Sequence, residues 1–392
     1  MRLLIGFCIL GLSWLTLVKT EPHKVVCYFG SWAVYRPGNG KIDISKLDPS
    51  LCTHMIYTFV GITDAGEVKV LDPWADLPDN GGKAGFQKFN ALRKRHPGMK
   101  TLVAIGGWNE GSQKYSRVAG KPALRSHFAE NAVDFVLKYK FDGLDIDWEY
   151  PNQRGGKPAD VRNFVLLLKE LRARFDEHNL ILTAAVAAAE VSASLSYNIP
   201  SISKYLDFIN IMTYDFHGSW DHITGHNTPL YPAKRETTAV SRGLNVNASV
   251  NYWLNHGVPA RKLVLGTALY GRTFTLSNSR KYTPGSAASG PGRAGQYTRQ
   301  PGMLGYNEIC EQQSHSTWIT AWDVEQRVPY AHYGDQWVSF DNVKSITEKA
   351  NYVKKMGLGG AMVWSIETDD FGGVCGNKYP LLNALNRVLR VQ

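Results

Sequence analysis

Residues 142–151 read DGLDIDWEYP, in which acidic residues alternate with apolar and aromatic ones. Such alternation is typical of a β-strand, where every second side chain faces the same side. Asp145, Asp147 and Glu149 therefore share one face, with neighbours about 6.6 Å apart along the strand. Trp148 has the opposite parity and is expected to pack outward against helices. Carboxylates this close favour sharing a proton, which raises the pKa of at least one of them, as a general acid requires.

Runs of β-branched and aromatic residues recur eight times, and most are continuously apolar, as strands covered on both faces are. These runs occupy residues 24–32, 54–62, 100–108, 141–149, 180–187, 207–215, 262–271 and 360–367. Helical patterns lie between and after them, at residues 123–137, 158–178, 247–256, 342–356 and 380–389. This alternation predicts an α/β fold, a closed (β/α)8 TIM barrel with its helices outside, in preference to an open doubly wound sheet.

One connection is longer than a single crossover helix needs, because about 90 residues separate the seventh strand from the eighth. Residues 272–340 begin rich in Gly, Pro, Ser and Tyr and end in short strand-like runs. We therefore expect a small α+β insertion over 272–340, seated on one rim of the barrel. Catalytic groups of such barrels lie at the carboxyl ends of the strands, which is where the acids of 142–151 stand.

Residues 1–20 carry a basic start and an apolar run from Leu3 to Val18. This run is shorter than the about 20 residues that span a bilayer. We expect a secretory signal peptide, cleaved near Thr20, that leaves 21–392 as a secreted, extracellular chain without membrane attachment. The alternative is an uncleaved membrane anchor.

The composition is that of a globular protein, with 44% hydrophobic and 20% charged residues. The formal net charge is +10. Because the positive charge is diffuse and no nucleic-acid-binding motif accompanies it, we expect a solvated surface rather than nucleic acid as a partner.

Four cysteines remain once Cys8 leaves with the signal peptide, and an even number in an oxidising compartment predicts two disulfides. These cysteines are Cys27, Cys52, Cys310 and Cys375, which allow three pairings. None belongs to a CxxC pair, so a zinc ribbon is not expected. The sequon that begins at Asn247 predicts a glycan on a surface segment.

The acidic cluster does not fit a metal site or a buried ion-pair network. A calcium-binding loop needs Gly where Tyr150 stands, before Pro151. A two-metal site would need histidines on neighbouring strands, and no HxH or HxxxH pair occurs there. A buried ion-pair network would need basic residues that the strand lacks. We therefore expect neither a metal nor another cofactor.

The acidic string DxxDxDxE resembles that of the family 18 glycoside hydrolases, the chitinases. Asp142, Asp145, Asp147 and Glu149 match it without departure. Four further motifs follow the order of that family, and the resemblance covers nearly the whole mature chain. These motifs are AIGGWN (104–109), MTYDFHGSW (212–220), LYGRTF (269–274) and GAMVWS (360–365). Ala104 stands where many members carry Ser, although animal-type members often have Ala.

The resemblance implies a monomer that hydrolyses β-1,4 linkages between N-acetylglucosamine units of chitin or chitooligosaccharides. The reaction would retain the anomeric configuration, with the substrate's own acetamido oxygen attacking the anomeric carbon. Glu149 would protonate the leaving oxygen and then activate water. Asp147 would hydrogen-bond the acetamido N–H, and Asp145 would exchange a proton with Asp147. Tyr214 would orient the acetamido carbonyl.

The same resemblance predicts a groove for a sugar chain, because pyranose rings stack on aromatic side chains. The expected groove residues are Tyr28, Trp32, Phe59, Gly107, Trp108, Asn109, Met212, Asp215, Trp220, Tyr270, Arg272 and Trp364. Trp364 would form the floor under the scissile sugar. The disulfides would pair Cys27 with Cys52 and Cys310 with Cys375. The tryptophans left unassigned are Trp74, Trp253, Trp318, Trp322 and Trp337.

Two alternative functions are compatible with the sequence. A non-catalytic chitin-binding lectin on the same barrel is disfavoured, because such relatives have typically lost the acidic Glu or a neighbouring Asp, and Glu149 and Asp147 are both present. An endo-β-N-acetylglucosaminidase that acts on protein-linked glycans shares the acidic string, but the insertion and the tryptophans favour chitin. For His217 a packing or hydrogen-bonding role is favoured over a catalytic one.

Overall fold

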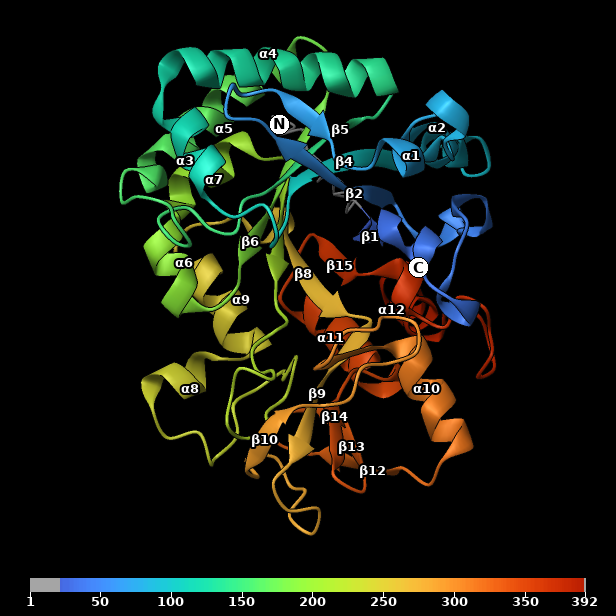
Figure 1. The fold of residues 1–392 in the computed structure, drawn as a ribbon. Helices are drawn as coiled ribbons and strands as arrows, with labels where there is room; N and C mark the ends of the chain where they lie inside the picture. Colours follow the sequence, from blue (N-terminus) through green and yellow to red (C-terminus); the bar gives the residue numbers. More distant parts are fainter. Residues whose placement is uncertain (1–21, 391–392) are drawn as a thin grey trace, which may run out of the picture.

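The structure, a computed structural model that describes residues 22–390, contains a closed barrel of eight parallel strands (Figure 1). The barrel closes because β1 pairs in parallel with both β2 and β15. Its strands are β1 (Lys24–Gly30), β2 (His54–Ile62), β4 (Lys100–Gly106), β5 (Gly143–Asp147), β6 (Ile181–Ala187), β7 (Phe208–Met212), β8 (Leu263–Ala268) and β15 (Gly360–Trp364). The short β3 (Val68–Val70) extends β2 as an antiparallel hairpin. The predicted TIM barrel is confirmed.

Helices surround the barrel (Figure 1). They are α1 (Pro73–Asp76), α2 (Gly85–Ala91), α3 (Gln113–Gly120), α4 (Pro122–Tyr139), α5 (Asp160–Asp176), α6 (Glu190–Ser196), α7 (Ile199–Tyr205), α8 (Ala239–Gly243), α9 (Val246–Asn255), α11 (Val343–Lys355) and α12 (Pro380–Leu389). Side-chain caps fix several starts: the Asn245 carboxamide accepts from the Ala248 amide at α9, and Asn342 forms a capping box with Ser345 at α11. None of the helices in residues 22–390 has the length and hydropathy needed to cross a bilayer.

A second, antiparallel sheet is inserted between β8 and β15, and Figure 1 shows it with α10 (Tyr306–His315) at one end of the molecule. Its strands are β9 (Tyr270–Leu276), β10 (Ala288–Pro291), β11 (Met303–Gly305), β12 (Ile319–Asp323), β13 (Val328–Tyr333) and β14 (Gln336–Ser339). The first of them begins at Tyr270, a residue that the sequence assigned to the seventh barrel strand. Only one residue separates β8 from β9, so the insertion starts directly at the barrel mouth.

The barrel strands bury both of their faces. Inward side chains form a small core inside the barrel, and outward ones form a larger core under the helices. Trp148 shows the outward packing: its ring stacks on Tyr115 of α3 at 5.2 Å and meets Phe164 of α5 edge-on at 5.7 Å. Its indole N–H donates to Ser112 Oγ at 3.0 Å. The predicted parity of the acidic strand is therefore correct.

Among residues 22–390 two disulfides form, with the pairing that the family resemblance implied. Cys27 of β1 is bonded to Cys52, just before β2. Cys310 of α10 is bonded to Cys375 in the loop after β15, which ties the insertion to the barrel. The proposed signal peptide, residues 1–20, lies outside the described residues.

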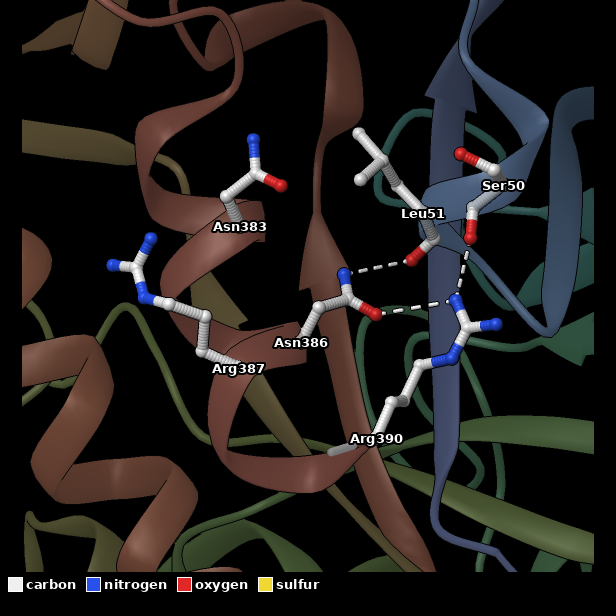
Figure 2. A pocket seen from close by; sticks show the side chains of 6 residues that line it. All are labelled: Ser50, Leu51, Asn383, Asn386, Arg387 and Arg390. Carbon is white, nitrogen blue, oxygen red and sulfur yellow. Dashed lines mark hydrogen bonds between the residues drawn. The ribbon is translucent and has the colours of Figure 1, made fainter. Parts of the chain in front are cut away.

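A shallow polar pocket lies between α12 and the turn that precedes β2 (Figure 2). Asn386 Nδ2 donates to the Leu51 carbonyl at 2.9 Å, and a guanidinium nitrogen of Arg390 donates to the Ser50 carbonyl at 2.5 Å. This pocket is at the amino-terminal end of β2, whereas Glu149 follows the carboxyl end of β5. Its hydrogen bonds fasten the last helix to the barrel, a stabilising role typical of that face.

Candidate active site

Three carboxylates stand at the carboxyl end of β5, at increasing height in the barrel. Asp145 and Asp147 are inside the strand, and Glu149 is two residues beyond its last residue. Asp145 is fully buried, Asp147 is almost fully buried, and Glu149 is partly exposed. The strand is thus shorter than predicted, because the chain leaves the sheet at the mouth, and this places only the last acid within reach of solvent.

Asp145, at the bottom of the set, is held by neutral donors from three other strands. Tyr28 Oη donates to Oδ2 at 2.7 Å, and Thr183 Oγ1 donates to Oδ1 at 2.5 Å. Asn210 Nδ2 lies 3.4 Å from the same Oδ1 and donates to the Tyr28 phenol oxygen at 3.0 Å. Burial raises the pKa of Asp145 to about 6, although these hydrogen bonds lower it. Asp145 can therefore gain or lose a proton near neutral pH.

Asp147 has the most unfavourable environment for a negative charge. Its pKa is raised well above the usual range, first by burial and then by the charges of Glu149 and Asp145. Its Oδ1 is buried and has no hydrogen-bond partner among residues 22–390. Buried carboxyl oxygens are rarely left without a partner, so this atom is available to a bound molecule.

The backbone of β4 approaches Asp147 closely. The Gly107 amide donates to the Asp147 carbonyl at 2.9 Å. A Cβ atom at Gly106 would lie 2.2 Å from that carbonyl oxygen, and one at Gly107 would lie 2.8 Å from the ring of Phe59. Both glycines also have positive φ angles, +115° and +83°. The pair in AIGGWN is therefore required by close packing beside the acids.

Glu149 has a pKa raised to about 7, with burial as the main cause. The charge of Asp215 raises this pKa further, whereas a hydrogen bond with Tyr150 and the charge of Arg154 lower it. A carboxyl group that is protonated near neutral pH and reaches the mouth of the barrel can act as a general acid.

Asp215 follows β7 and is joined to the insertion. Arg272 binds it in a bidentate manner, with Nε–Oδ1 and Nη2–Oδ2 distances of 2.7 and 2.6 Å, and Tyr270 Oη donates to Oδ1 at 2.6 Å. Asp215 has a φ angle of +59°, uncommon for a non-glycine residue, and its amide donates to Asn227 Oδ1 at 2.9 Å. These contacts fix its carboxylate at the rim, from where its charge acts on Glu149.

Aromatic rings gather beside the carboxylates. Trp364, which ends β15, lies 5.8 Å from Phe59 and 6.2 Å from Trp32, measured between ring centroids. Tyr28 lies below, 5.6 Å from Trp364. The stacked rings of Trp32 and Phe59 complete a continuous aromatic surface next to Asp147 and its neighbours. Such a surface suits the apolar face of a sugar ring.

Two further tryptophans are exposed at the mouth, and an arginine guanidinium lies over the ring of each. Trp108, after β4, is 58% exposed, and Trp220, after β7, is 55% exposed. The guanidinium carbon of Arg154 lies 3.5 Å from the Trp108 ring centroid, and that of Arg272 lies 5.1 Å from the Trp220 centroid. Both indoles are therefore accessible for stacking on a bound ring.

Comparison with known proteins identifies the family. A model of the glycosyl hydrolases family 18 matches residues 24–369. The chain belongs to this family. Probable chitinase 2 of Drosophila melanogaster is 46% identical over 90% of this chain and 73% of its own length. Chitotriosidase-1 of Mus musculus is 40% identical over 94% of this chain and 78% of its own length.

Solved structures agree with the family 18 assignment. The Group IV chitinase of Ostrinia furnacalis in complex with allosamidin has a TM-score of 0.91 and 48% identity, covering 94% of this chain and 98% of that one. Human YKL-39, described as a pseudo-chitinase with retained chitooligosaccharide binding, has a TM-score of 0.86 and 37% identity, covering 94% of this chain and 100% of that one. Chitinases and a pseudo-chitinase thus share this fold.

In this family 18 chain the predicted groove residues lie on or after the barrel strands and on β9, at different depths. Tyr28 is buried, and its phenol O–H donates to Asp145. Tyr214 is partly buried beside Met362, its Oη 3.9 Å from the sulfur atom. Asn109 is exposed, and Met212 packs against the inner barrel core. His217 Nδ1 lies within hydrogen-bonding distance of Asp221 Oδ2, at 3.0 Å, and its non-catalytic role stays a prediction.

Sequence reasoning missed the residues that hold the acids. Thr183 and Asn210 touch Asp145, Asn227 supports Asp215, and Arg154 lies on Trp108. A signal was present for two of them, because Thr183 and Asn210 are polar residues inside otherwise apolar strands.

The structure also places the unassigned positions. Trp253 and Trp337 are buried, whereas Trp74 is exposed and the remaining two are partly exposed. Asn247 lies in the first turn of α9, partly buried, and its Oδ1 accepts a hydrogen bond from Tyr352 Oη at 3.0 Å. Its glycosylation stays a prediction.

Proposed function

We propose that this family 18 protein is a secreted chitinase that cleaves β-1,4 linkages between N-acetylglucosamine units. The reaction would retain the anomeric configuration through an oxazolinium intermediate formed by the substrate's own acetamido group. Secretion is supported by the two disulfides, which form in oxidising compartments.

The observation that carries the mechanism is the buried Oδ1 atom of Asp147, which has no hydrogen-bond partner among the described residues. A buried carboxyl oxygen without a partner needs a hydrogen-bond donor, and an acetamido N–H is a donor of the right kind. When this N–H is bound, Asp147 in its ionised form would stabilise the positive charge that develops on the acetamido group. Asp145 would take up the proton that Asp147 releases, because its own pKa of about 6 lies near neutral pH.

Glu149 would protonate the leaving glycosidic oxygen and later remove a proton from the attacking water. Its raised pKa keeps the proton available near neutral pH. Trp364 would support the sugar at the cleaved bond, and Tyr214 would donate its phenol O–H to the acetamido carbonyl. Asp215, held at the rim by Arg272, would bind the same sugar.

The direct test is Glu149→Gln, which keeps the shape of the side chain and removes the acid. With chitohexaose as substrate, kcat should fall by about 10²- to 10⁴-fold, the range for loss of a general acid. Glu177→Gln, on the exposed end of α5, is the matched control and should retain wild-type turnover. In the wild type, kcat/KM should decline above pH about 7, as Glu149 ionises. A Gln variant with wild-type turnover would contradict the mechanism.

Substrate choice is tested separately. Fresh cleavage products examined by proton NMR should carry the β-anomer, because retention is expected. The wild-type protein should cleave chitohexaose and leave a high-mannose glycoprotein intact. Cleavage of the glycoprotein alone would identify an endo-β-N-acetylglucosaminidase instead. Binding of chitohexaose without cleavage would identify a lectin.

A further inference from the structure

Arg154 makes an unusual set of contacts beside the general acid. Its guanidinium lies over the indole of Trp108, with 3.5 Å from its carbon atom to the ring centroid. One of its terminal nitrogens donates to two backbone carbonyls, that of Trp108 at 2.8 Å and that of Glu149 at 3.0 Å. A single side chain therefore joins the loop after β4 to Glu149, two residues beyond the end of β5.

The loop that carries Arg154 is firmly held. Arg154 has a φ angle of +51° and Asn152 one of +63°, both uncommon for non-glycine residues. Asn152 and Gln153 donate side-chain hydrogen bonds to α6, and Ser112 Oγ donates to the Tyr150 carbonyl. Unfavourable backbone conformations of this kind persist where the surrounding contacts fix them.

The contact makes use of the planar shape of the arginine side chain. A planar guanidinium can stack on an indole and donate to carbonyls at its edge at the same time, which an ammonium group cannot do. Arg154 covers one face of the Trp108 ring, and the residue nevertheless stays exposed, so the rest of the indole is open to a ligand. A pyranose ring that rests there would have its position set by the same side chain that holds the backbone of Glu149.

We infer that Arg154 is a positioning residue: it fixes the Trp108 ring relative to Glu149, so that a sugar unit stacked on Trp108 brings its chain into register with the acid. The inference rests on the proposed function and deepens it. Arg154 also lies close enough to lower the pKa of Glu149 by its charge. Its two effects, stacking and charge, can be separated because lysine keeps only the second.

The test compares Arg154→Ala, Arg154→Lys, Trp108→Ala and the double variant Arg154→Ala/Trp108→Ala on chitohexaose. Arg154→Ala should raise KM about fivefold with little change in kcat, as expected for loss of one stacked cation and the ring it orders. The same change should have no further effect on KM in the Trp108→Ala background. Arg154→Lys should raise KM as well.

The pH profile separates the charge from the stacking. Loss of the cation in Arg154→Ala raises the pKa of Glu149, so the alkaline decline of kcat/KM should move to higher pH. Arg154→Lys should leave that decline where the wild type has it. Substitution of a residue with a merely structural role would show no coupling with Trp108→Ala in the double variant. It would also leave this pH profile unchanged.

Arg174→Ala is the matched control. Arg174 is a surface arginine on α5, and it pairs with Glu130 of α4 rather than with a residue of the candidate site. Its KM should equal that of the wild type.

Additive effects of Arg154→Ala and Trp108→Ala, or a wild-type KM in both Arg154 variants, would overturn the inference. If Arg154→Ala does not fold, Arg154→Lys with and without Trp108→Ala carries the test. If the wild type binds chitohexaose without cleaving it, the proposed function fails, and calorimetric affinities of the same variants still decide the role of Arg154.

Discussion

The fully buried Asp145 allows a quantitative prediction about stability. Its pKa rises from an ordinary 3.8 to about 6 in the folded protein. This shift means that ionising Asp145 costs about 3 kcal/mol more free energy in the folded than in the unfolded state. Because the folded-state pKa is raised, the folded state prefers the protonated acid, and stability is lost as the pH increases from about 4 to about 6. Asp145→Asn removes this titration and keeps a side chain of the same shape, with an oxygen for Thr183 and a carboxamide N–H₂ that can donate to the Tyr28 phenol oxygen.

The assay is denaturation by guanidinium chloride at a series of pH values, with disulfides intact. The difference in free energy of unfolding between Asp145→Asn and the wild type should increase, in favour of the variant, by about 3 kcal/mol as the pH rises from about 3.5 to about 7.5. Asp134→Asn, at an exposed position of α4, controls for the loss of a carboxylate. A stability difference between Asp145→Asn and the wild type that is constant across this range would refute the reasoning. The same variant should lose activity, since the proton acceptor behind Asp147 is gone.

Three further outcomes are expected. Tyr28→Phe removes the donor to Asp145 and should lower kcat by about tenfold, the effect of about 1.4 kcal/mol, in steady-state kinetics on chitohexaose; an unchanged kcat would contradict this. Replacing Cys310 and Cys375 by Ser opens a loop of 65 residues and should lower the free energy of unfolding by about 4 kcal/mol, measured by denaturant titration; an unchanged midpoint would contradict the constraint. Gly107→Ala, at φ +83° and against a neighbouring ring, should cost about 1–3 kcal/mol by the same assay, and wild-type stability would show that the loop adapts.

The barrel strands could be predicted because strands buried on both faces are continuously apolar, and eight such runs alternate with helical patterns. Their carboxyl ends could not be located from composition. The predicted strands run on to Glu149 and Asp215, whereas β5 ends at Asp147 and β7 at Met212. Apolar and aromatic residues line the mouth as they line the sheet, so the sequence pattern does not mark where pairing stops.

The acidic residues of the site were visible as a pattern, but their supporting partners were not. Thr183 and Asn210 meet Asp145 from β6 and β7, a contact that depends on the register of strands across the barrel. Arg154 resembles an ordinary loop arginine in the sequence, and neither its positive φ angle nor its contact with Trp108 has a local signal. Long-range contacts of this kind depend on three-dimensional placement and have no local signature.

The short connection between β8 and β9 limits how the protein can be divided. Tyr270 and Arg272, which hold Asp215 at the rim, both belong to β9, the first strand of the inserted sheet. A shortened barrel lacking the insertion would therefore lose two of the side chains that fix a charge near Glu149. The candidate site thus includes the first strand of the inserted sheet, and the insertion cannot be cut away at β9 without removing side chains that hold Asp215.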